Sequence, residues 1–362
     1  MTNRTSIRLA DGRELIYFDD LPGRDRSAAD TRDLEAPFHA PEIRRDAVHD
    51  EWVIVAAHRQ GRTHLPPASE CPLCPSRQDH PTEVPAPDYD VVAFENRFPS
   101  LVPSPVRVES DGGLLERRPG VGRCEVLSYT SDHDAVFAEL PPGRLATIGR
   151  ALVDRTTALS ATVGVEYVYC FENRGEEIGV TLAHPHGQIY GYPYLPPRID
   201  RALASAERHE RDTGGCLFCD VLIAELEAGE RIVAETDGFV AFVPHAPRWP
   251  FEIHVYSRRH VPDLASLAED TLDEAMRLQA DVLARFTALF PSPPPYIASW
   301  LQAPVRHGRE RWHLHLEVLT VRRSATKLKY LAGSESGVGA FINDVTPEEA
   351  ARLLRERRRA PA

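Results

Sequence analysis

The chain has 362 residues, 42% of them hydrophobic and 8% aromatic, which is typical of a folded globular protein long enough for two domains. Its formal net charge of -12 argues against a protein that binds nucleic acid through a broad basic surface. No apolar stretch approaches the roughly 18 residues of a membrane span, and the amino terminus has no apolar core of an export signal. We therefore expect a cytoplasmic protein without a membrane partner.

The first half is expected to combine short strands with one long helix. Runs of β-branched and aromatic residues predict strands at residues 11–20, 51–57, 90–94, 124–129 and 167–171. Apolar residues at helical spacing predict a helix over residues 142–162. The strand at 51–57 leads into Arg59 and Arg62, whose guanidinium groups suit the capture of an anion at a strand end, with ordinary solvated surface arginines as the alternative.

The stretch His184-Pro185-His186-Gly187-Gln188 carries the clearest chemical signal. In an extended strand side chains alternate, so His184, His186 and Gln188 are expected on one face. Gly187 has no side chain and lets another backbone or a ligand approach closely. A pair of ordinary loop histidines is the alternative, because short motifs also occur by chance.

The second half repeats this order of features after a proline-rich connection at residues 190–197. We expect an amphipathic segment at 216–227, a long helix at 270–290, and strands at 239–243, 253–256 and 312–317. Each half has a Cys-x-x-Cys pair, a His that closes a strand, a helix, and then His-x-His-x-Gln or His-x-His-x-Glu. This order predicts a tandem duplication into two α+β domains, residues 1–195 and 196–362, with antiparallel sheets and packed helices.

The two Cys-x-x-Cys pairs predict metal sites. A tetrahedral zinc ion takes four nitrogen or sulfur ligands, and structural sites are usually closed sets such as Cys₂His₂. We expect one set at Cys71, Cys74, His133 and His184, and a possible second set at Cys216, Cys219, His260 and His313. A redox-active cysteine pair is the alternative, although CPLC does not follow a strand and open a helix as such motifs do.

With His184 on a metal, His186 is available for chemistry. A neutral imidazole is a good nucleophile near neutral pH and can attack phosphorus. Gln188 on the same face can donate its amide to a phosphoryl oxygen as charge develops there. The sequence has neither a P-loop nor a Gly-rich dinucleotide-binding motif, so these other ways of holding phosphates are not supported.

Taken together, these stretches resemble the histidine-triad superfamily and, within it, the galactose-1-phosphate uridylyltransferase family. The resemblance extends from about Ile43 to the carboxyl end. It rests on EWVIVAAHRQGR, CPLC, FENRF, CEVLSYTSDH, FENRG, HPHGQIY, PRWPFE, WHLH, RRSATKLKYLAG and TPEEAARLL. It implies tandem histidine-triad-like domains, a homodimer, and uridylyl exchange between UDP-glucose and galactose 1-phosphate by a ping-pong route.

The resemblance also implies roles for individual residues. His186 matches the family's nucleophile, and Gln188 matches the residue that steadies the phosphoryl group. The residues implied to hold the nucleotide are Arg59, Arg62, Phe94, Asn96, Asn173 and Thr181. Lys329, Tyr330 and Glu335 match the segment that meets the sugar phosphate, and Lys327 and Lys329 are the chain's two lysines. Ser334 stands where a well-known branch has an aromatic residue, so the preferred hexose stays open.

Two departures from that branch concern the second half. The branch has another metal site built from a Glu and three His, of which His313 and His315 are present, whereas Leu301 replaces the third. His307 is a possible substitute, and the pair Cys216 and Cys219 offers a different second site. Glu317 replaces Gln at the position equivalent to Gln188, so this half is expected to lack a second nucleophile.

Two other functions stay open. A nucleoside diphosphate-sugar or dinucleotide phosphorylase of the same superfamily would use the same His but take inorganic phosphate as acceptor. A zinc-stapled nucleotide-binding module without catalysis would have no use for His186. Lys329 and Glu335 favour a sugar-phosphate acceptor.

Overall fold

The computed structural model describes residues 3–35, 40–61, 64–109 and 112–357. The elements of the first half are β1 (Asn3–Arg8), β2 (Glu14–Asp19), β3 (Glu42–Asp46), β4 (Glu51–Val55), β5 (Val91–Glu95), β6 (Arg117–Pro119), β7 (Arg123–Ser128), α1 (Pro142–Ser160), β8 (Tyr167–Arg174) and β9 (His186–Tyr192). Those of the second half are α2 (Pro197–Thr213), α3 (Leu217–Ala228), β10 (Ile232–Glu235), β11 (Phe239–Phe242), β12 (Phe251–Ser257), α4 (Glu269–Ala288), β13 (Tyr296–Leu301), β14 (His315–Thr320), β15 (Arg322–Ser324), β16 (Lys327–Leu328) and α5 (Pro347–Glu356).

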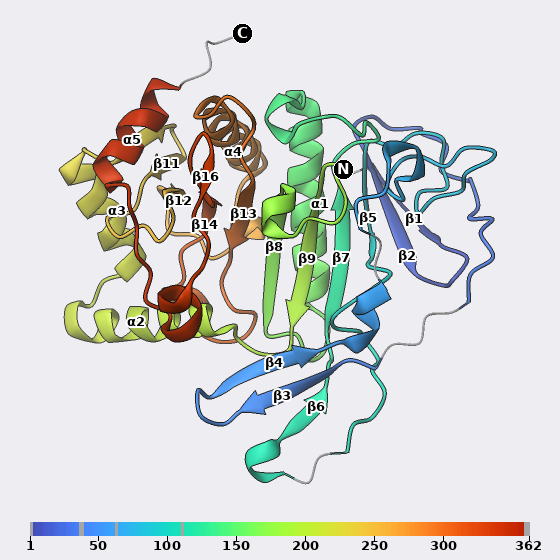
Figure 1. The fold of residues 1–362 in the computed structure, drawn as a ribbon, viewed down its shortest axis with the longest axis horizontal. Coiled ribbons are helices and arrows are strands. Elements are labelled where there is room, and N and C mark those ends of the chain that lie inside the picture. Colours follow the sequence, from blue (N-terminus) through green and yellow to red (C-terminus); the bar gives the residue numbers. More distant parts are fainter. Residues whose placement is uncertain (1–2, 36–39, 62–63, 110–111, 358–362) are drawn as a thin grey trace.

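One antiparallel sheet of eleven strands runs through both halves, in the order β1-β2-β5-β7-β9-β8-β13-β14-β12-β11-β10. The order β5-β7-β9-β8 is mirrored by β11-β12-β14-β13, and the antiparallel pair of β8 and β13 joins the halves at the centre (Figure 1). The predicted α+β fold with a tandem duplication is therefore confirmed. The boundary after residue 195 stays a prediction, because strands from both halves share the sheet.

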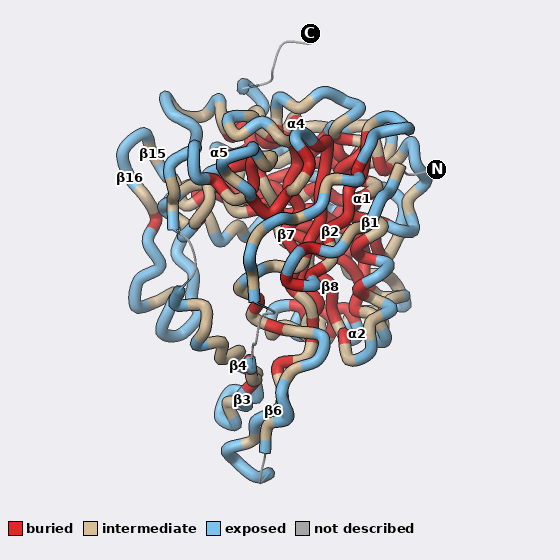
Figure 2. The backbone as a smooth tube through the Cα atoms, turned by 90° about the vertical axis from the view of Figure 1, so that its right-hand side faces the viewer, coloured by how far each residue is buried: buried red, intermediate tan, exposed pale blue. Residues whose placement is uncertain are grey.

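Helices cover the two faces of this sheet unequally. α1 and α4 pack against one face, where Ile148 and Leu152 of α1 and Met276 of α4 belong to the largest buried cluster. α2 and α3 lie over the second half on the other face, where Phe218 and Trp312 are buried together. The buried residues follow the central strands and α1 (Figure 2). Over the first half, no α-helix among the described residues packs on the second face, so a site can form there beside the loop segment of Leu73 and Val84.

Two central elements, α2 and β13, were not predicted. α2 buries only Ile199, Leu203 and Ala206 in a helix that is otherwise rich in charge, so its apolar stripe is narrow. β13 is buried along most of its length and therefore lacks the alternation of a half-exposed strand. Its neighbour β14 begins at His315, three residues later than expected, because His313 turns toward the second cysteine pair.

A separate sheet of three strands, in the order β4-β3-β6, extends away from the body in both views (Figures 1 and 2). Arg118 of β6 lies over the ring of Trp52 in β4, with its guanidinium carbon 4.5 Å from the ring centroid. Within the described ranges, no helix has both the length and the apolar character needed to cross a membrane.

Candidate active site

Strand β9 places the predicted catalytic residues at the centre of the first half. It pairs with β7 and β8, so that Ser128 lies opposite His186 and Phe171 lies opposite Gln188. His186 and Gln188 face the side of the sheet away from α1, since successive side chains in a strand alternate. Gly187 between them faces the helices.

The imidazole of His186 is held in a defined tautomer. Its Nδ1–H donates to the backbone carbonyl oxygen of His184 at 2.7 Å. Burial lowers the pKa of His186, so the ring is neutral and Nε2 carries the lone pair. This hydrogen bond leaves Nε2 as the ring nitrogen whose lone pair can act as a nucleophile.

The side chain of Gln188 is oriented by its neighbour on the same face. The hydroxyl of Tyr190 donates to Gln188 Oε1 at 3.0 Å. Burial raises the pKa of Tyr190, so this hydroxyl keeps its proton and remains a donor. With its oxygen engaged, Gln188 presents its NH₂ group as a donor to the space in front of the sheet.

A cavity of about 290 Å³ lies in front of β9. The predicted residues that line it are Arg59, Phe94, Asn96, Asn173, Thr181, His186 and Gln188. Residues that sequence reasoning missed also line it, among them Arg97, Phe98, Val126, Phe171 and Tyr190. The signal was present for Phe171 and Tyr190, which share a strand face with Asn173 and Gln188.

Lys329, Tyr330 and Glu335 do not line this cavity within one chain. Arg62 lies outside the described residues. Lys329 pairs with Glu335, with Nζ and Oε1 2.9 Å apart, and also donates to the carbonyl oxygen of Ile342. The Lys329 ammonium lowers the pKa of Glu335. Tyr330 is 76% exposed.

The first predicted metal group is assembled beside β9. One ligand atom from each of Cys71, Cys74, His133 and His184 lies within 4.8 Å of every other. Cys74 Sγ is 3.5 Å from His133 Nδ1 and 3.6 Å from His184 Nδ1. A tetrahedral zinc ion with bonds of about 2.3 Å to sulfur and about 2.05 Å to nitrogen would separate such atoms by about 3.6 Å. The four residues therefore fit a metal ion.

The tautomer of His184 supports this fit. Its Nε2 donates to the carbonyl oxygen of Thr130 at 2.7 Å, which leaves the Nδ1 lone pair directed at the cysteines. Burial lowers the pKa of His184 to about 4, so the ring is neutral at physiological pH. Burial and the adjacent Cys71 raise the pKa of Cys74 to about 12, opposite to the depressed pKa that a reactive redox thiol requires.

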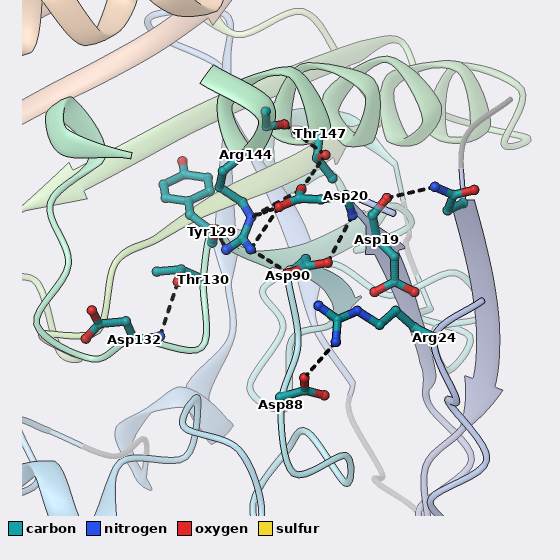
Figure 3. Close-up of polar contacts among 12 residues, drawn as sticks. Asp19, Asp20, Arg24, Asp88, Asp90, Tyr129, Thr130, Asp132, Arg144 and Thr147 are labelled. Carbon is teal, nitrogen blue, oxygen red and sulfur yellow. Dashed lines mark hydrogen bonds and ion pairs between the residues drawn. The ribbon is translucent and has the colours of Figure 1, made fainter. Parts of the chain in front are cut away.

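Arg144, in the first turn of α1, holds the segment that carries Thr130 (Figure 3). Its guanidinium pairs with Asp90 at 2.5 Å and with Asp20 at 3.0 Å, and donates to the carbonyl oxygen of Tyr129 at 3.4 Å. Tyr129 precedes Thr130, whose carbonyl orients His184. This ion-pair network therefore connects α1 to the first metal group.

The second predicted metal group repeats the same geometry. Cys216, Cys219, His260 and His313 each bring a ligand atom within 4.8 Å of the others. Cys219 Sγ is 3.5 Å from His260 Nδ1 and 3.4 Å from His313 Nδ1. His313 Nε2 donates to the carbonyl oxygen of Ser257 at 2.7 Å. These residues also fit a metal ion, and His307 belongs to no such group among the described residues.

The second-half counterpart of His186, His315, is enclosed by charged and aromatic groups. His315 Nδ1 donates to the carbonyl oxygen of His313 at 2.8 Å, as His186 does to His184. Glu317, at the position of Gln188, accepts two hydrogen bonds from Arg198 at 2.6 and 2.7 Å. His254, His315 and Arg198 lower the pKa of Glu317. This carboxylate is therefore ionised and engaged, in contrast to the amide of Gln188.

The duplicated sheet, with His-x-His-x-Gln facing a cavity beside a Cys₂His₂ group, defines the class of histidine-triad nucleotidyltransferases. Models of the N-terminal and C-terminal domains of galactose-1-phosphate uridyl transferase match residues 32–196 and 203–360. The chain belongs to the galactose-1-phosphate uridylyltransferase family.

Individual relatives align with this chain over most of their own length. The chain is 42% identical to the galactose-1-phosphate uridylyltransferase of Streptomyces lividans, covering 98% of this chain and 97% of that protein. It is 40% identical to that of Thermotoga maritima, covering 87% and 98%. A solved structure of a uridylyltransferase is 32% identical, with a TM-score of 0.79 and coverage of 87% of this chain and 98% of the other.

On the helix side of β9, the close packing of Gly187 against Tyr129 predicts the effect of adding a side chain there. A Cβ at Gly187 would overlap the hydroxyl of Tyr129 and lie 3.0 Å from the carbonyl oxygen of Phe171. Gly187→Ala should lower the free energy of unfolding by about 1–3 kcal/mol through overpacking. Tyr129→Phe removes the overlapping hydroxyl, so the double variant should lose less stability than the two single losses added together, as measured by urea denaturation.

Gly143→Ala in α1 is the matched control, because no atom lies within 4 Å of its Cβ position, and its stability should stay within about 0.5 kcal/mol of the wild type. Additive losses from Gly187→Ala and Tyr129→Phe would contradict the proposed overlap.

Proposed function

We propose that this chain exchanges a uridylyl group between UDP-glucose and galactose 1-phosphate through a covalent uridylyl-His186 intermediate. The observation that carries the proposal is the state of His186, which is neutral, holds its proton on Nδ1 and lines the cavity with Nε2 available. A group in this state can attack the α-phosphorus of a bound nucleotide sugar. Membership of the family supplies the substrates.

In the first half-reaction, His186 Nε2 bonds to the α-phosphorus of UDP-glucose, and the bond from that phosphorus to the bridging oxygen breaks. Glucose 1-phosphate leaves with the electron pair of the broken bond. The positive charge that develops on the imidazole is stabilised by the Nδ1–H bond to the His184 carbonyl oxygen. In the second half-reaction, a phosphate oxygen of galactose 1-phosphate attacks the same phosphorus and the P–N bond breaks, which releases UDP-galactose and restores His186.

The remaining residues of the cavity would bind and orient the nucleotide sugar. Gln188 would donate its amide to a phosphoryl oxygen whose charge grows in the transition state. The predicted nucleotide ligands within the described residues are Arg59, Phe94, Asn96, Asn173 and Thr181, and all of them line the cavity with His186. Phe94 and Phe171 offer apolar ring surface to the base, whereas Arg59 offers a cation to the phosphates.

Lys329, Tyr330 and Glu335 would meet the sugar phosphate from the second subunit of a homodimer. Within one chain these residues stand apart from the cavity, and the segment that carries them exposes apolar side chains. Val338 is 80% exposed and Ile342 is 59% exposed. Apolar side chains gathered on one exposed segment are typical of an interaction site.

Zinc would be held by Cys71, Cys74, His133 and His184, and a second ion by Cys216, Cys219, His260 and His313. In both places the ion would join a Cys-x-x-Cys segment to two histidines outside the strands of the sheet, and its contribution there is structural. Neither group belongs to the transfer step itself, since all four protein ligand positions are filled in each.

The transfer step is tested by intact-protein mass spectrometry after incubation with UDP-glucose alone. The wild type should gain one uridylyl group, and galactose 1-phosphate should discharge it. His186→Asn should gain none. His315→Asn, the equivalent change in the second half, should still form the adduct and serves as the matched control.

Discharge of that adduct by inorganic phosphate, and not by galactose 1-phosphate, would replace the transferase with a phosphorylase. If the wild type forms no adduct with any nucleotide sugar, the chain is better described as a nucleotide-binding module without catalysis.

The role of a second subunit is tested by mixing two inactive variants, His186→Asn and Lys329→Met. If each site uses its own His186 and the partner's loop, half of the dimers are mixed and each mixed dimer has one intact site. An equal mixture that is dissociated and reassembled should therefore recover about a quarter of wild-type activity. No recovery beyond that of each variant alone would show that the loop does not act across subunits.

The two metal groups are tested by measuring zinc per chain with inductively coupled plasma mass spectrometry. Cys74→Ser and Cys219→Ser should each remove half of the bound zinc, because each breaks one group. Cys124→Ser changes a buried cysteine outside both groups and should retain all of it. Unchanged zinc in Cys219→Ser would rule out the second site.

A further inference from the structure

Glu172 is a buried carboxyl group directly behind the strand of the nucleophile. In β8 it lies opposite Gly187 of β9 on one side and opposite Ala298 of β13 on the other. Its residue exposure is 4%. Because side chains alternate along β8, Glu172 faces the helices, whereas Phe171 and Asn173 line the cavity. Glu172 therefore contacts no substrate in the cavity.

The hydrogen bonding of Glu172 links the two halves of the chain. The hydroxyl of Tyr296 in β13 donates to Glu172 Oε1 at 2.6 Å. Burial raises the pKa of Tyr296, so its hydroxyl keeps the proton. Across the described parts of the chain, Glu172 Oε2 has no hydrogen-bond partner. A fully buried carboxyl oxygen without a protein partner is uncommon and calls for a physical explanation.

A small cavity adjoins this carboxyl group. Its volume is about 20 Å³, and its lining includes Tyr129, Glu172, Gly187, Gln188 and Gln279. The other lining residues are mostly apolar, and a space of this size accommodates at most one water molecule, which can bond the unpaired Glu172 oxygen. The cavity lies on the helix side of β9, so whatever fills it supports the backbone between His186 and Gln188.

The protonation state of Glu172 follows from its surroundings. Burial raises the pKa of Glu172 to about 7, although the Tyr296 hydrogen bond and the charge of Arg174 lower it in part. The other titratable groups near it are Tyr129 at the end of β7 and Cys170 in β8, and the polar group from α4 is the uncharged Gln279. Burial therefore favours the neutral acid over the carboxylate, and Gln has nearly the same shape and likewise combines an acceptor oxygen with a donor group.

We propose that Glu172 is a positioning residue for uridylyl transfer, and that its hydrogen bond to Tyr296 fixes the strand of His186 and Gln188 against the second half of the chain. The inference rests on the proposed function. Misplacing a nucleophile by a fraction of an ångström slows the chemical step more than it weakens substrate binding, because the contacts in front of the sheet are kept.

The test compares Glu172→Gln, Glu172→Ala and Tyr296→Phe in the steady-state exchange reaction. Glu172→Ala should lower kcat at least about tenfold with KM for UDP-glucose changed less than about twofold. Glu172→Gln should keep at least half of the wild-type kcat. Tyr296→Phe loses only a hydroxyl and should lower kcat in the same direction, and combining it with Glu172→Ala should add little.

Glu176→Ala is the control for removing a carboxylate from the same region, since Glu176 is exposed, and it should leave kcat unchanged. If Glu172→Ala fails to fold, Tyr296→Phe alone decides. Wild-type kcat in Glu172→Ala or in Tyr296→Phe overturns the inference, and so does a Glu172→Gln variant as slow as Glu172→Ala. Absence of turnover in the wild type would instead overturn the proposed function.

A pH series tests the neutral form without relying on activity. A Glu carboxyl group in an unfolded chain has a pKa of about 4.3, whereas burial raises the pKa of folded Glu172 to about 7. Between these values the folded state binds more protons, so this group's contribution to stability falls as pH rises and stays reduced above about pH 7. As pH rises across this range, the denaturation midpoint of Glu172→Gln should therefore increase relative to that of the wild type. A constant difference would show that folding does not shift the pKa of Glu172.

Discussion

The hydrogen bond from His186 Nδ1 to the carbonyl oxygen of His184 is the interaction on which the site depends. His184 directs its own Nδ1 at Cys74, while its backbone oxygen sets the tautomer of His186. One residue thus belongs to the metal group through its side chain and to the reactive group through its main chain. The four residues of the first metal group and His186 are consequently held in a single arrangement, supported from α1 by Arg144.

The second half repeats this arrangement of histidines but differs in the residue at the position of Gln188. His313 and His315 repeat the contacts of His184 and His186, including the bond to the preceding carbonyl oxygen. Glu317 in place of Gln188 brings a carboxylate that Arg198 neutralises from α2. An amide with a free donor suits a phosphoryl group, whereas an ionised, engaged carboxylate repels one. The same backbone therefore supports a reactive site in one half and an enclosed ion pair in the other.

The central pair of β8 and β13 gives the second half a part in the site of the first. Asn173 and Phe171 line the cavity from β8, which hydrogen-bonds to β13 on its other edge. The bond between Tyr296 and Glu172 crosses this junction behind β9. The two halves thus share one continuous hydrogen-bonded sheet, although they are repeats in sequence.

Local patterns in the sequence determined which residues form the candidate site and the two metal groups. Alternation in HPHGQ placed His186 and Gln188 on one face, and the two Cys-x-x-Cys pairs with their distant histidines gave both ligand groups, because residue type and short spacing carry that information. The pairing of β8 with β13, the packing of α2 that brings Arg198 to Glu317, and the burial of Glu172 beside Tyr296 arise between residues far apart in the chain. No local period encodes such contacts, so only the tertiary structure decided them.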